Sequence, residues 1–517
     1  MTRGAAAGAH QRYLDLVEQI ERRFAVADWR SGEVELWPLA RMDLYLDLFR
    51  DQGGGGASPS PPPFLWRIAT SLATPLTNLW SSRRDLAHRV VRPAPAHAVI
   101  LGDGVSLDRV DGAWQDRFGE PLIAAFERRG LTTFLMQGGR VNRLPRRRPT
   151  FAANVIAVQG ALGARLSRTA ADLPDHEAVL GFLADQGARA PSLGRVALEH
   201  RGRLVASTAS AFERVLRTVR PKVAFVVTWY AGLGPAFMLA CRRQGILSVD
   251  LQHCPQGGSH KAYGWWALPK AGYAVLPAVF WTWTEADATH IRRWTQTLVA
   301  PWHGALHGGH TQLAPFLDDG DPRTRAWDAA FDAIGGRAYA REILVALQPS
   351  PGHRALWDAL AAEIEAAPPD WRWWIRRHPA STAAQGADFG RLLALASPKV
   401  VVDAASQLPL PALLRRMSAV VSLASGAAVE AAVLGVPALF LSLEARGLFP
   451  DLLARGLARL LEVQNLNDTI ADLPAPPTRP LFVHAPDLDE TLAQLEALAP
   501  GYARLCADRR AAKSGGG

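Results

Sequence analysis

Residues 417–443, MSAVVSLASGAAVEAAVLGVPALFLSL, decide the fold of this chain. The apolar run over residues 419–423 predicts a buried strand, and the Ala-Ser-Gly turn at 424–426 predicts the start of a helix. Gly-Val-Pro at 435–437 ends that helix, and a second apolar strand follows. Strand, helix and strand in this order form the crossover unit of a parallel sheet, so the segment predicts an α/β fold.

The turn in this segment has the chemistry of an anion site. The first N–H groups of a helix lack partners within the helix, and together with the helix dipole they favour a phosphate. Gly426 lets a phosphate approach the backbone, and the hydroxyl of Ser425 or Ser422 can donate to it. Glu430 lies about one turn deeper, where its charge suits a ribose hydroxyl and repels a phosphate. We expect a nucleotide-sugar site here, and the alternative is a purely structural β-α-β unit.

The segment resembles the nucleotide-binding segment of GT-B glycosyltransferases and of the related UDP-GlcNAc 2-epimerases. Those families carry a Ser-Gly turn, a Glu on the next helix and a Gly-x-Pro exit, as this chain does. Strands and helices alternate over about residues 95–485, in agreement with the resemblance. It implies an α/β fold with two doubly wound, Rossmann-like domains facing across a cleft, and ligands at the carboxyl ends of the strands.

Composition divides the chain into further segments. Residues 1–50 predict an N-terminal helical extension, and residues 51–63, DQGGGGASPSPPP, are a Gly- and Pro-rich linker. The apolar residues 64–94 predict either docking against the first domain or contact with a membrane surface. The remaining predicted segments are an acceptor domain (95–305), a linker (306–326), a nucleotide-sugar domain (327–485) and a C-terminal helix (486–512).

The net charge of the chain excludes few classes of partner. The spacing of its cysteines and its N-terminal sequence indicate the cellular compartment. The net charge is +9, but 52 of the 57 basic residues are Arg and only five are Lys, and the dense cluster at 146–148 is short. Without a basic run interleaved with aromatic residues, we expect no nucleic-acid partner. The three cysteines are widely spaced, which indicates a reducing compartment. No signal peptide is predicted, and Gly and Pro interrupt the uncharged residues 223–241, so we expect a cytoplasmic protein, peripheral at the inner membrane face if 64–94 binds lipid.

Residues 376–379, Arg-Arg-His-Pro, end a predicted strand of the second domain. His378 can donate to a phosphate oxygen, and Arg376 adds positive charge beside it. The pattern resembles the His-Pro motif of bacterial transferases that use CMP-activated acidic sugars and of capsule-polysaccharide transferases. In those families it is paired with a Ser-containing turn, here Ser422 or Ser425. The resemblance assigns His378 and this serine to the nucleotide-sugar site. The alternative is that Arg-Arg-His-Pro is a plain strand-end turn.

Residues 252–260, QHCPQGGSH, end a strand of the first domain. With Tyr263 behind them, they resemble the Gln-His-Gly…His…Tyr segment of surface-polysaccharide transferases, although Cys254 stands where Gly is usual. The resemblance places Gln252, His260 and Tyr263 on the acceptor side. It makes His253 a candidate base or a contact to the departing phosphate, unless it is a structural histidine.

Residues 101–106, LGDGVS, follow the first strand of the first domain. They resemble the acidic-Gly motif that carries the catalytic base in the CMP-sialic acid transferase families. Those families have two acidic residues before the Gly, whereas Gly102 occupies the first position here. Asp103 is a candidate base, unless Gly-Asp-Gly is simply a turn. Asp103 and His253 are therefore candidates for one role, and the sequence does not decide between them.

The resemblance as a whole implies a GT-B glycosyltransferase of capsule or lipopolysaccharide assembly. Such an enzyme moves a sugar from a nucleotide donor to a polysaccharide or lipid-linked acceptor. One alternative is a sugar-nucleotide 2-epimerase, which usually has paired acidic residues where Glu430 stands alone. Others are a teichoic-acid-type polyol-phosphate polymerase, which expects Trp-His-Gly, and an inactive GT-B scaffold in export. The Asp-Gly-Asp at 319–321 lies in a predicted linker, so we expect no metal and no cofactor.

Overall fold

A computed structural model of the chain describes residues 5–52, 91–110, 112–138, 146–254, 256, 258, 260–335, 339–348, 353–378, 389–395, 397–474 and 487–514. The chain forms two compact units, and each is built around one parallel sheet. The N-terminal unit comprises Gly8–His253, Lys261–Gly309 and Pro486–Gly517, and the C-terminal unit comprises Met1–Ala7, Cys254–His260 and His310–Ala485.

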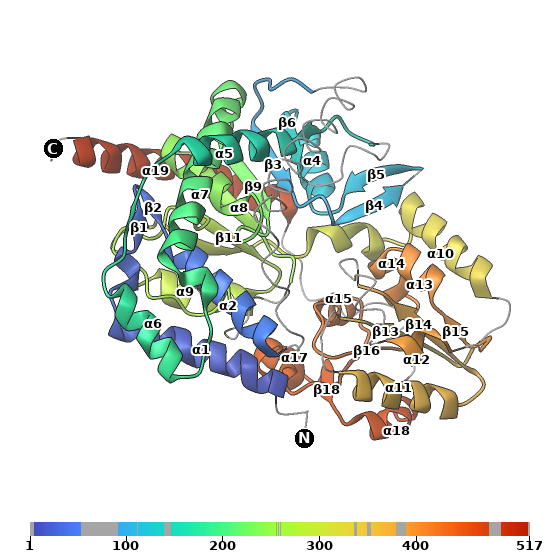
Figure 1. The fold of residues 1–517 in the computed structure, drawn as a ribbon. Helices are drawn as coiled ribbons and strands as arrows, with labels where there is room; N and C mark the ends of the chain where they lie inside the picture. The colour runs from blue at the N-terminus through green and yellow to red at the C-terminus, as the bar shows by residue number, and fades with distance from the viewer. Residues whose placement is uncertain are drawn as a thin grey trace. The chain divides into compact units, whose positions relative to one another are not determined.

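The N-terminal unit has a seven-stranded parallel sheet (Figure 1). Its central strands, such as AVILG and VAFVV, are buried at every residue, as expected for a sheet covered on both faces. The chain winds outward from β3 in one direction and then from β9 in the other, so the winding reverses between these two strands. In sheet order the strands are β12 (Gly304–His307), β11 (Val279–Thr282), β10 (Leu247–Leu251), β9 (Val223–Val227), β3 (Ala98–Gly102), β6 (Thr133–Gln137) and β7 (Phe151–Ala152).

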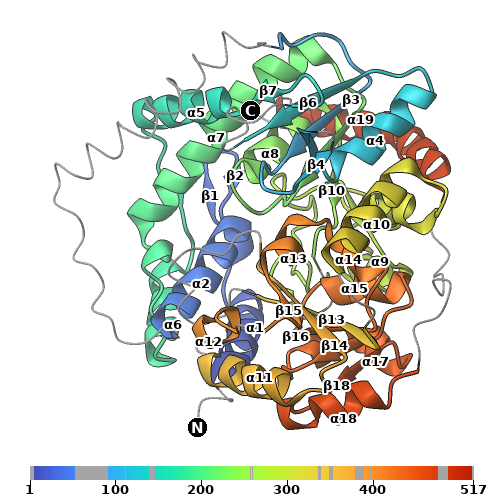
Figure 2. The ribbon, with the colours of Figure 1, turned by 90° about the vertical axis from the view of Figure 1, so that its right-hand side faces the viewer.

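Helices cover both faces of this sheet (Figure 1, Figure 2). On one face Phe126 packs against Phe225 of β9, with ring centroids 6.1 Å apart. On the other face Phe212 packs against Phe237 at 5.0 Å. The helices of this unit's α/β part are α4 (Gly119–Arg128), α5 (Asn154–Leu166), α6 (His176–Asp185), η3 (Pro191–Leu193), α7 (Arg195–Val219), α8 (Gly234–Gln244), α9 (Glu285–Thr295) and α19 (Leu488–Ser514).

The N-terminal extension is helical only in part. Helices α1 (Ala5–Arg23) and α2 (Trp37–Gln52) agree with the prediction, and η1 (Val26–Asp28) follows α1. Between them the short strands β1 (Arg30–Ser31) and β2 (Val34–Glu35) form a hairpin that pairs with β8 (Ala171–Asp172). Gly32 supplies the positive φ of +60° that the turn requires, which is why this stretch leaves the helical pattern.

Buried charges attach the extension to the rest of the unit. Glu21 accepts hydrogen bonds from Arg41 Nη1 at 3.0 Å, from Trp37 Nε1 at 2.8 Å and from the backbone N–H of Ala267 at 3.1 Å. The side chains of Glu21 and Arg41 are only 1% and 2% exposed, respectively. An unpaired charge at such depth is costly, so this pair fixes how the helices dock.

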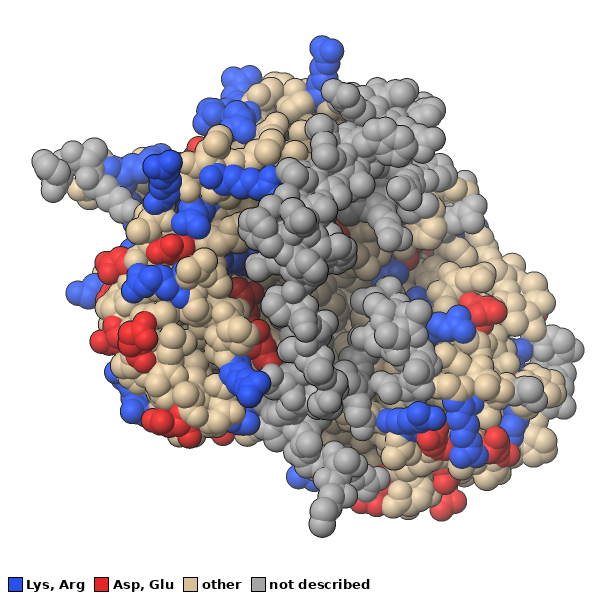
Figure 3. All heavy atoms as spheres, viewed as in Figure 1, with Lys and Arg blue, Asp and Glu red and all other residues tan. Residues whose placement is uncertain are grey.

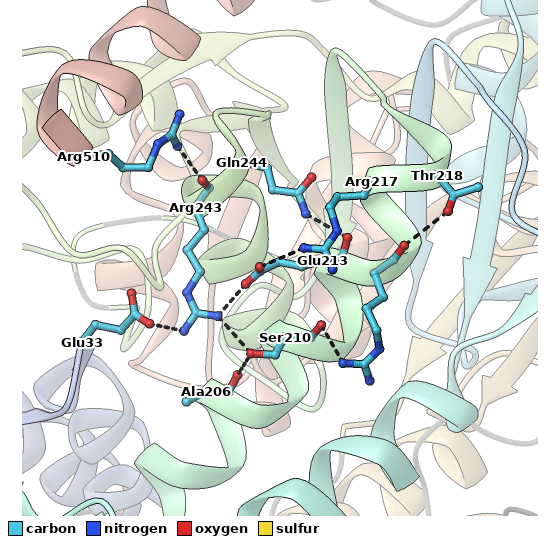
Figure 4. A network of polar contacts seen from close by, with 10 residues as sticks. Glu33, Ala206, Ser210, Glu213, Arg217, Thr218, Arg243, Gln244 and Arg510 are labelled. Atoms are coloured by element: carbon cyan, nitrogen blue, oxygen red, sulfur yellow. Dashed lines mark hydrogen bonds and ion pairs between the residues drawn. The ribbon is translucent and has the colours of Figure 1, made fainter. Parts of the chain in front are cut away.

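A second junction centres on Arg243 of α8 (Figure 4). Its guanidinium donates to Glu33 of the hairpin turn and to Glu213 of α7, both at 2.6 Å. Its carbonyl oxygen accepts from Arg510 of α19 at 2.5 Å. Segments from both ends of the chain therefore meet in the N-terminal unit.

The residues after Asp103 differ from the prediction of a helix over 115–129. The structure has an antiparallel hairpin of β4 (Leu107–Val110) and β5 (Ala113–Asp116), and α4 begins only at Gly119. Gly112 adopts φ +77° in the hairpin turn. Local pairing in the hairpin thus prevails over the helical propensity of the first predicted turn.

The C-terminal unit has a six-stranded parallel sheet. Its winding reverses between β13 and β16. In sheet order the strands are β15 (Val400–Val401), β14 (Trp371–Arg376), β13 (Arg341–Ala346), β16 (Ala419–Ser422), β17 (Ala438–Phe440) and β18 (Ala458–Leu460).

Helices pack against this second sheet (Figure 2), and aromatic side chains join them to the strands. Trp357 and Trp373 belong to one core cluster that joins α11 and α18 to the strands. Phe331 of α10 stacks on Trp374 with centroids 4.6 Å apart. The helices are η4 (Thr311–Leu317), α10 (Pro322–Gly335), α11 (Arg354–Ala366), α12 (Gly390–Leu393), α13 (Asp403–Gln407), α14 (Leu410–Leu414), α15 (Ala427–Val433), α16 (Ala445–Leu448), α17 (Pro450–Ala454), η6 (Val463–Asn465) and α18 (Leu466–Ala471).

Two doubly wound parallel sheets, one in each unit, confirm the predicted fold class. The predicted linker 51–63 and segment 64–94 fall mostly outside the described residues, and the predicted domain limits stay a prediction. Among the described helices, none has both the length and the apolar character needed to cross a bilayer.

Charged side chains are unevenly spread on the face in Figure 3. Over the N-terminal unit, Lys and Arg gather near α5 and α7, while acidic and basic side chains alternate near α6 and α1. Among the described residues on this face, charge does not form one continuous basic field of the kind that binds nucleic acid.

Candidate functional site

Predicted site residues lie beside the point in each sheet where the winding reverses. In the N-terminal unit this switch point lies between β3 and β9, and in the C-terminal unit it lies between β13 and β16. Loops leave such a point in opposite directions, so ligands bind there at the carboxyl ends of the strands. We call the two groups of residues the N-terminal site and the C-terminal site.

The serine turn of the C-terminal site is held by side chains that bond to the backbone. Ser422, the last residue of β16, accepts at its Oγ from the N–H of Ser425 at 3.2 Å, and Ser425 Oγ accepts from Ala427 at 3.3 Å. Gln348, directly after β13, bridges to Ala424 by accepting from its N–H at 2.8 Å and donating to its carbonyl at 3.2 Å. The sequence analysis did not identify Gln348, although a polar residue after a buried strand was the available signal.

Glu430 lies on α15 with only 8% of its surface exposed. One carboxylate oxygen lies 3.6 Å from His310 Nε2, and the other, Oε2, is buried and accepts no hydrogen bond from any described residue. Buried polar atoms normally have partners, so an orphaned carboxylate oxygen indicates a place for a hydroxyl donor. His310 was missed because the sequence placed it in the predicted linker.

Arg376 and His378, the two residues predicted to contact phosphate at the end of β14, have different surroundings. Arg376 donates from Nη1 to the carbonyl oxygens of Ala405, at 2.6 Å, and Leu408, so this nitrogen anchors the loop after α13. Desolvation of the His378 ring by its neighbours and then the charge of Arg376 lower the pKa of His378. β14 and β16 flank β13, which places their carboxyl ends about 10 Å apart on one edge. Pro379, the last residue of the motif, falls outside the described residues.

Asp103 follows β3 at the N-terminal site and is partly exposed. Its Oδ1 accepts from the N–H groups of Val105 and Ser106, both at 2.8 Å, and its Oδ2 accepts from Ser106 Oγ at 2.7 Å. The carboxylate is therefore fixed in an Asx-type turn at the switch point. The interpretation as a turn is confirmed, and the role of Asp103 as a base stays a prediction.

A second carboxylate, from Asp116, lies beside this turn and was not predicted. Asp116 Oδ1 accepts from the N–H groups of Phe118, at 3.1 Å, and Gly119, at 2.6 Å, which open α4, and Oδ2 accepts from Gln137 Nε2. A Cβ atom at Gly102 would lie 2.1 Å from Asp116 Oδ2, so only glycine fits there. Burial and then the charge of Asp103 raise the pKa of Asp116 to about 6.

His253 follows β10 and contacts two hydroxyl groups. Its Nε2 lies 3.2 Å from Thr228 Oγ1 and 3.3 Å from Tyr230 Oη. Burial lowers the pKa of His253 to about 4, with Asp103 acting in the opposite direction and Lys261 in the same one. A neutral imidazole with so low a pKa is a weak base at neutral pH and suits hydrogen bonding better. Which of Asp103 and His253 acts as the base stays a prediction.

Two predicted acceptor contacts have structural partners instead. Gln252 is 1% exposed, and its amide accepts from the N–H of Trp283 at 2.5 Å and donates to Asp287 at 3.0 Å. Tyr263 is fully buried and donates to Asp250 at 2.8 Å. These placements favour roles in supporting the site, so direct acceptor contact by either residue stays a prediction.

His260 belongs to the C-terminal unit rather than to the N-terminal site. Its Nε2 lies 3.6 Å from the sulfur of Cys254, and both side chains are partly exposed. Its predicted acceptor contact stays a prediction.

A mostly apolar cavity of about 250 Å³ lies near the start of α8. Gly232 and Leu233, which precede α8, line it together with apolar residues of α5 and α7, and Arg201 contributes a charge. Among the described residues, no group of three or more His, Cys, Asp or Glu side chains is placed to hold a metal ion.

No family model matches this chain, and no curated protein matches it. Solved structures with a similar arrangement include UDP-GlcNAc 2-epimerase from Methanocaldococcus jannaschii in complex with UDP-GlcNAc and UDP. The identity is 13%, 78% of this chain and 98% of that chain are covered, and the TM-score is 0.43.

Two further solved structures are similar to the same extent. UDP-GlcNAc 2-epimerase from Neisseria meningitidis, bound to UDP-GlcNAc, is 14% identical over 77% of this chain and 98% of that chain, with a TM-score of 0.44. The glycosyltransferase SnogD from Streptomyces nogalater is 16% identical over 81% and 99%, with a TM-score of 0.36. At these TM-scores the similarity carries no further argument. The fold class rests on the two observed sheets alone.

Proposed function

We propose that this chain is a GT-B glycosyltransferase that uses a nucleotide-activated sugar. An acceptor hydroxyl attacks the anomeric carbon, its proton passes to a carboxylate, and the nucleotide leaves with the electron pair of the broken bond. In this proposal the C-terminal site binds the donor, and the N-terminal site receives the acceptor.

The observation that carries the proposal is the state of Glu430. A buried carboxylate whose Oε2 accepts no hydrogen bond from the described residues lies one helical turn behind a serine-glycine turn, at the switch point of a doubly wound sheet. A ribose or sugar hydroxyl would satisfy that oxygen with a charge-assisted hydrogen bond. The phosphate would then lie toward Ser425 and Gly426, with His378 on the same edge of the sheet.

At the N-terminal site we assign the base to Asp103. Its carboxylate is held by three local hydrogen bonds and is partly exposed, so it can receive a proton from a bound hydroxyl. His253 stays neutral and would hold the acceptor or the leaving group by a hydrogen bond.

The finer assignment rests on the sequence motifs. The His-Pro and acidic-Gly patterns support a CMP-linked acidic sugar as one donor class. They also support a growing surface polysaccharide or a lipid-linked glycan as acceptor, in capsule or lipopolysaccharide assembly. We propose cytoplasmic action without a metal, with the 64–94 segment in contact with the inner membrane face.

One specific observation supports a second enzyme class. Asp103, Asp116 and His253 are electrostatically coupled within one unit, and such a group could move protons on a sugar ring. This is the chemistry of a sugar-nucleotide 2-epimerase, which also shares the Ser-Gly…Glu segment. Incubation with donor in D₂O separates the two classes, because epimerisation introduces deuterium into the recovered sugar nucleotide and glycosyl transfer does not.

The Glu430→Gln variant tests the donor site. We expect affinity for the preferred nucleotide to fall about 10- to 100-fold, because a hydrogen bond to a charged group contributes about 1.5–3 kcal/mol. Binding is measured by thermal shift with CMP, CDP, UDP and GDP, each at about 100 times its dissociation constant, where stabilisation is about 2.7 kcal/mol.

The matched control for this experiment is Glu365→Gln. Glu365 lies at the last turn of α11 in the same unit, and its side chain is 53% exposed. It should leave nucleotide binding unchanged. If none of the four nucleotides stabilises the wild-type protein, or if both variants bind equally well, the donor-site assignment is wrong.

A further inference from the structure

Thr228 adopts a backbone conformation that its residue type disfavours. Its φ is +68°, and among the described non-glycine residues only Asp175 and Arg220 also have positive φ. Thr228 is the β-branched member of this group, and for such a residue the left-handed region is an outlier. Strain of this kind persists where the surrounding structure holds it, and it is often found at functional sites.

The connection between β9 and α8, residues 228–234, is held in place from two sides. Asp250 on the neighbouring strand β10 is completely buried, and its Oδ1 accepts from the N–H of Trp229 at 3.0 Å. A Cβ atom at Gly234 would lie 2.3 Å from the carbonyl oxygen of Trp229, so the chain passes too close for any side chain there. The strained residue is therefore fixed by its neighbours and not left to relax.

This connection brings two hydroxyl groups to one nitrogen atom. Thr228 Oγ1 and Tyr230 Oη lie 3.2 and 3.3 Å from His253 Nε2. The rings of Tyr230 and His253 are 6.0 Å apart between centroids, and Tyr263, the other partner of Asp250, lies 6.5 Å from the His253 ring. Asp250 thus holds the backbone next to Tyr230 and the hydroxyl of Tyr263, and both tyrosine rings lie beside His253.

We propose that Thr228 is a positioning residue whose strained conformation orients the imidazole of His253, and that Asp250 is the anchor that maintains it. A Thr with ordinary φ would direct its side chain elsewhere and leave Tyr230 alone on Nε2. The inference concerns the geometry of His253 and does not depend on which reaction the chain catalyses.

The proposal predicts two separate effects, one on the melting temperature and one on the titration of His253. Thr228→Gly and Thr228→Val both remove the hydroxyl, but only glycine also removes the strain. We expect Thr228→Gly to melt about 1.5–3 °C above Thr228→Val, because a left-handed L-residue costs about 1–2 kcal/mol and a unit as large as this one shifts by about 1.5 °C per kcal/mol.

The state of His253 is measured by NMR titration of protein labelled with ¹³C-histidine, and His253→Gln identifies the resonance. In both variants we expect the titration of His253 to shift from that of the wild type, because the hydroxyl that contacts Nε2 and orients the ring is lost. Asp103, Lys261, Tyr230 and Tyr263 also face this ring, and they remain in every variant. Thr228→Ser, which keeps the hydroxyl, should titrate as the wild type does.

Two further variants complete the test. Asp250→Asn should shift the His253 titration in the same direction as Thr228→Val, because the anchor for the connection is lost. Arg220→Gly relieves another positive φ, +50° at the end of α7, and should leave His253 unchanged. An unaltered His253 titration in Thr228→Val, or in Thr228→Gly if Val does not fold, would overturn the proposal.

Discussion

At the N-terminal site, single atoms decide which residues are tolerated. Gly102 has no side chain because Asp116 Oδ2 occupies the space next to its Cα, only 2.1 Å from where a Cβ would lie. The chain therefore does hold two carboxylates at this point, but the second comes from β5 and not from the position before Asp103. Asp116 is buried and hydrogen-bonded to the start of α4, so its charge acts on the site without contact with solvent.

Asp116 makes a pH-dependent contribution to stability. Its folded pKa of about 6 lies above the usual value of 3.8, so the folded state binds more protons than the unfolded chain between these values. The stability that this group contributes is therefore present below about pH 4 and is lost as the pH rises through 6.

Asp116→Asn does not titrate and isolates this effect. We expect the free energy of unfolding of the wild type, relative to the variant, to fall by up to about 3 kcal/mol between pH 4 and pH 7. Urea unfolding of both proteins at the two pH values measures it. Asp185→Asn, on the exposed end of α6, is the control and should show no such trend. A difference that stays constant with pH would contradict the raised pKa.

At the scale of secondary-structure elements, the N-terminal extension depends on one buried ion pair. Glu21 and Arg41 join α1 to α2, and Glu21 also holds the backbone at Ala267, in the loop that begins at Lys261. The same loop carries Tyr263, which donates to Asp250, so the extension supports the N-terminal site through this loop. Its role is therefore structural within the unit.

Arg41→Ala tests this dependence. We expect a loss of about 3–5 kcal/mol, because the variant leaves the charge of Glu21 buried and unpaired. Arg22→Ala is the control, since Arg22 pairs with Glu18 on the same helix with side chains 70% and 49% exposed. An exposed pair contributes about 0–1 kcal/mol. Equal effects of the two substitutions in thermal or urea unfolding would refute the structural role.

The sequence predicted elements better than contacts. Runs such as VAFVV and AVVS have unambiguous apolar patterns, and their strands and the helices behind them lie where expected. The helix predicted over 115–129 begins only at Gly119, because Gln115 and Asp116 pair with β4 in the hairpin. Asp116, Thr228 and His310 escaped prediction because each acquires its role from a residue on another element.

At the scale of the whole chain, helix α19 belongs to the N-terminal unit, although it follows the C-terminal unit in sequence. Its Glu496 pairs with His97 and with Arg129, both at 2.5 Å, and Tyr502 packs against Trp302 with centroids 6.4 Å apart. The C-terminal unit lies between these partners in sequence but takes no part in these contacts.

Truncation after residue 486 tests this assignment. We expect the N-terminal unit to lose cooperative unfolding, because removing α19 exposes apolar surface over β9, β10 and α8. The C-terminal unit should keep its protection. Hydrogen exchange read by mass spectrometry resolves the two units. Retained protection in β9 and β10 of the truncated chain would show that α19 is dispensable.

The position of α19 also orders events during synthesis. Domains generally fold as units while the chain leaves the ribosome, at about 5–20 residues per second. The C-terminal unit has all its residues once translation passes Ala485, whereas the N-terminal unit still lacks α19, which is translated afterwards. The unit that starts to emerge first is therefore completed after the other one, and its surface for α19 stays uncovered until α19 has left the ribosome.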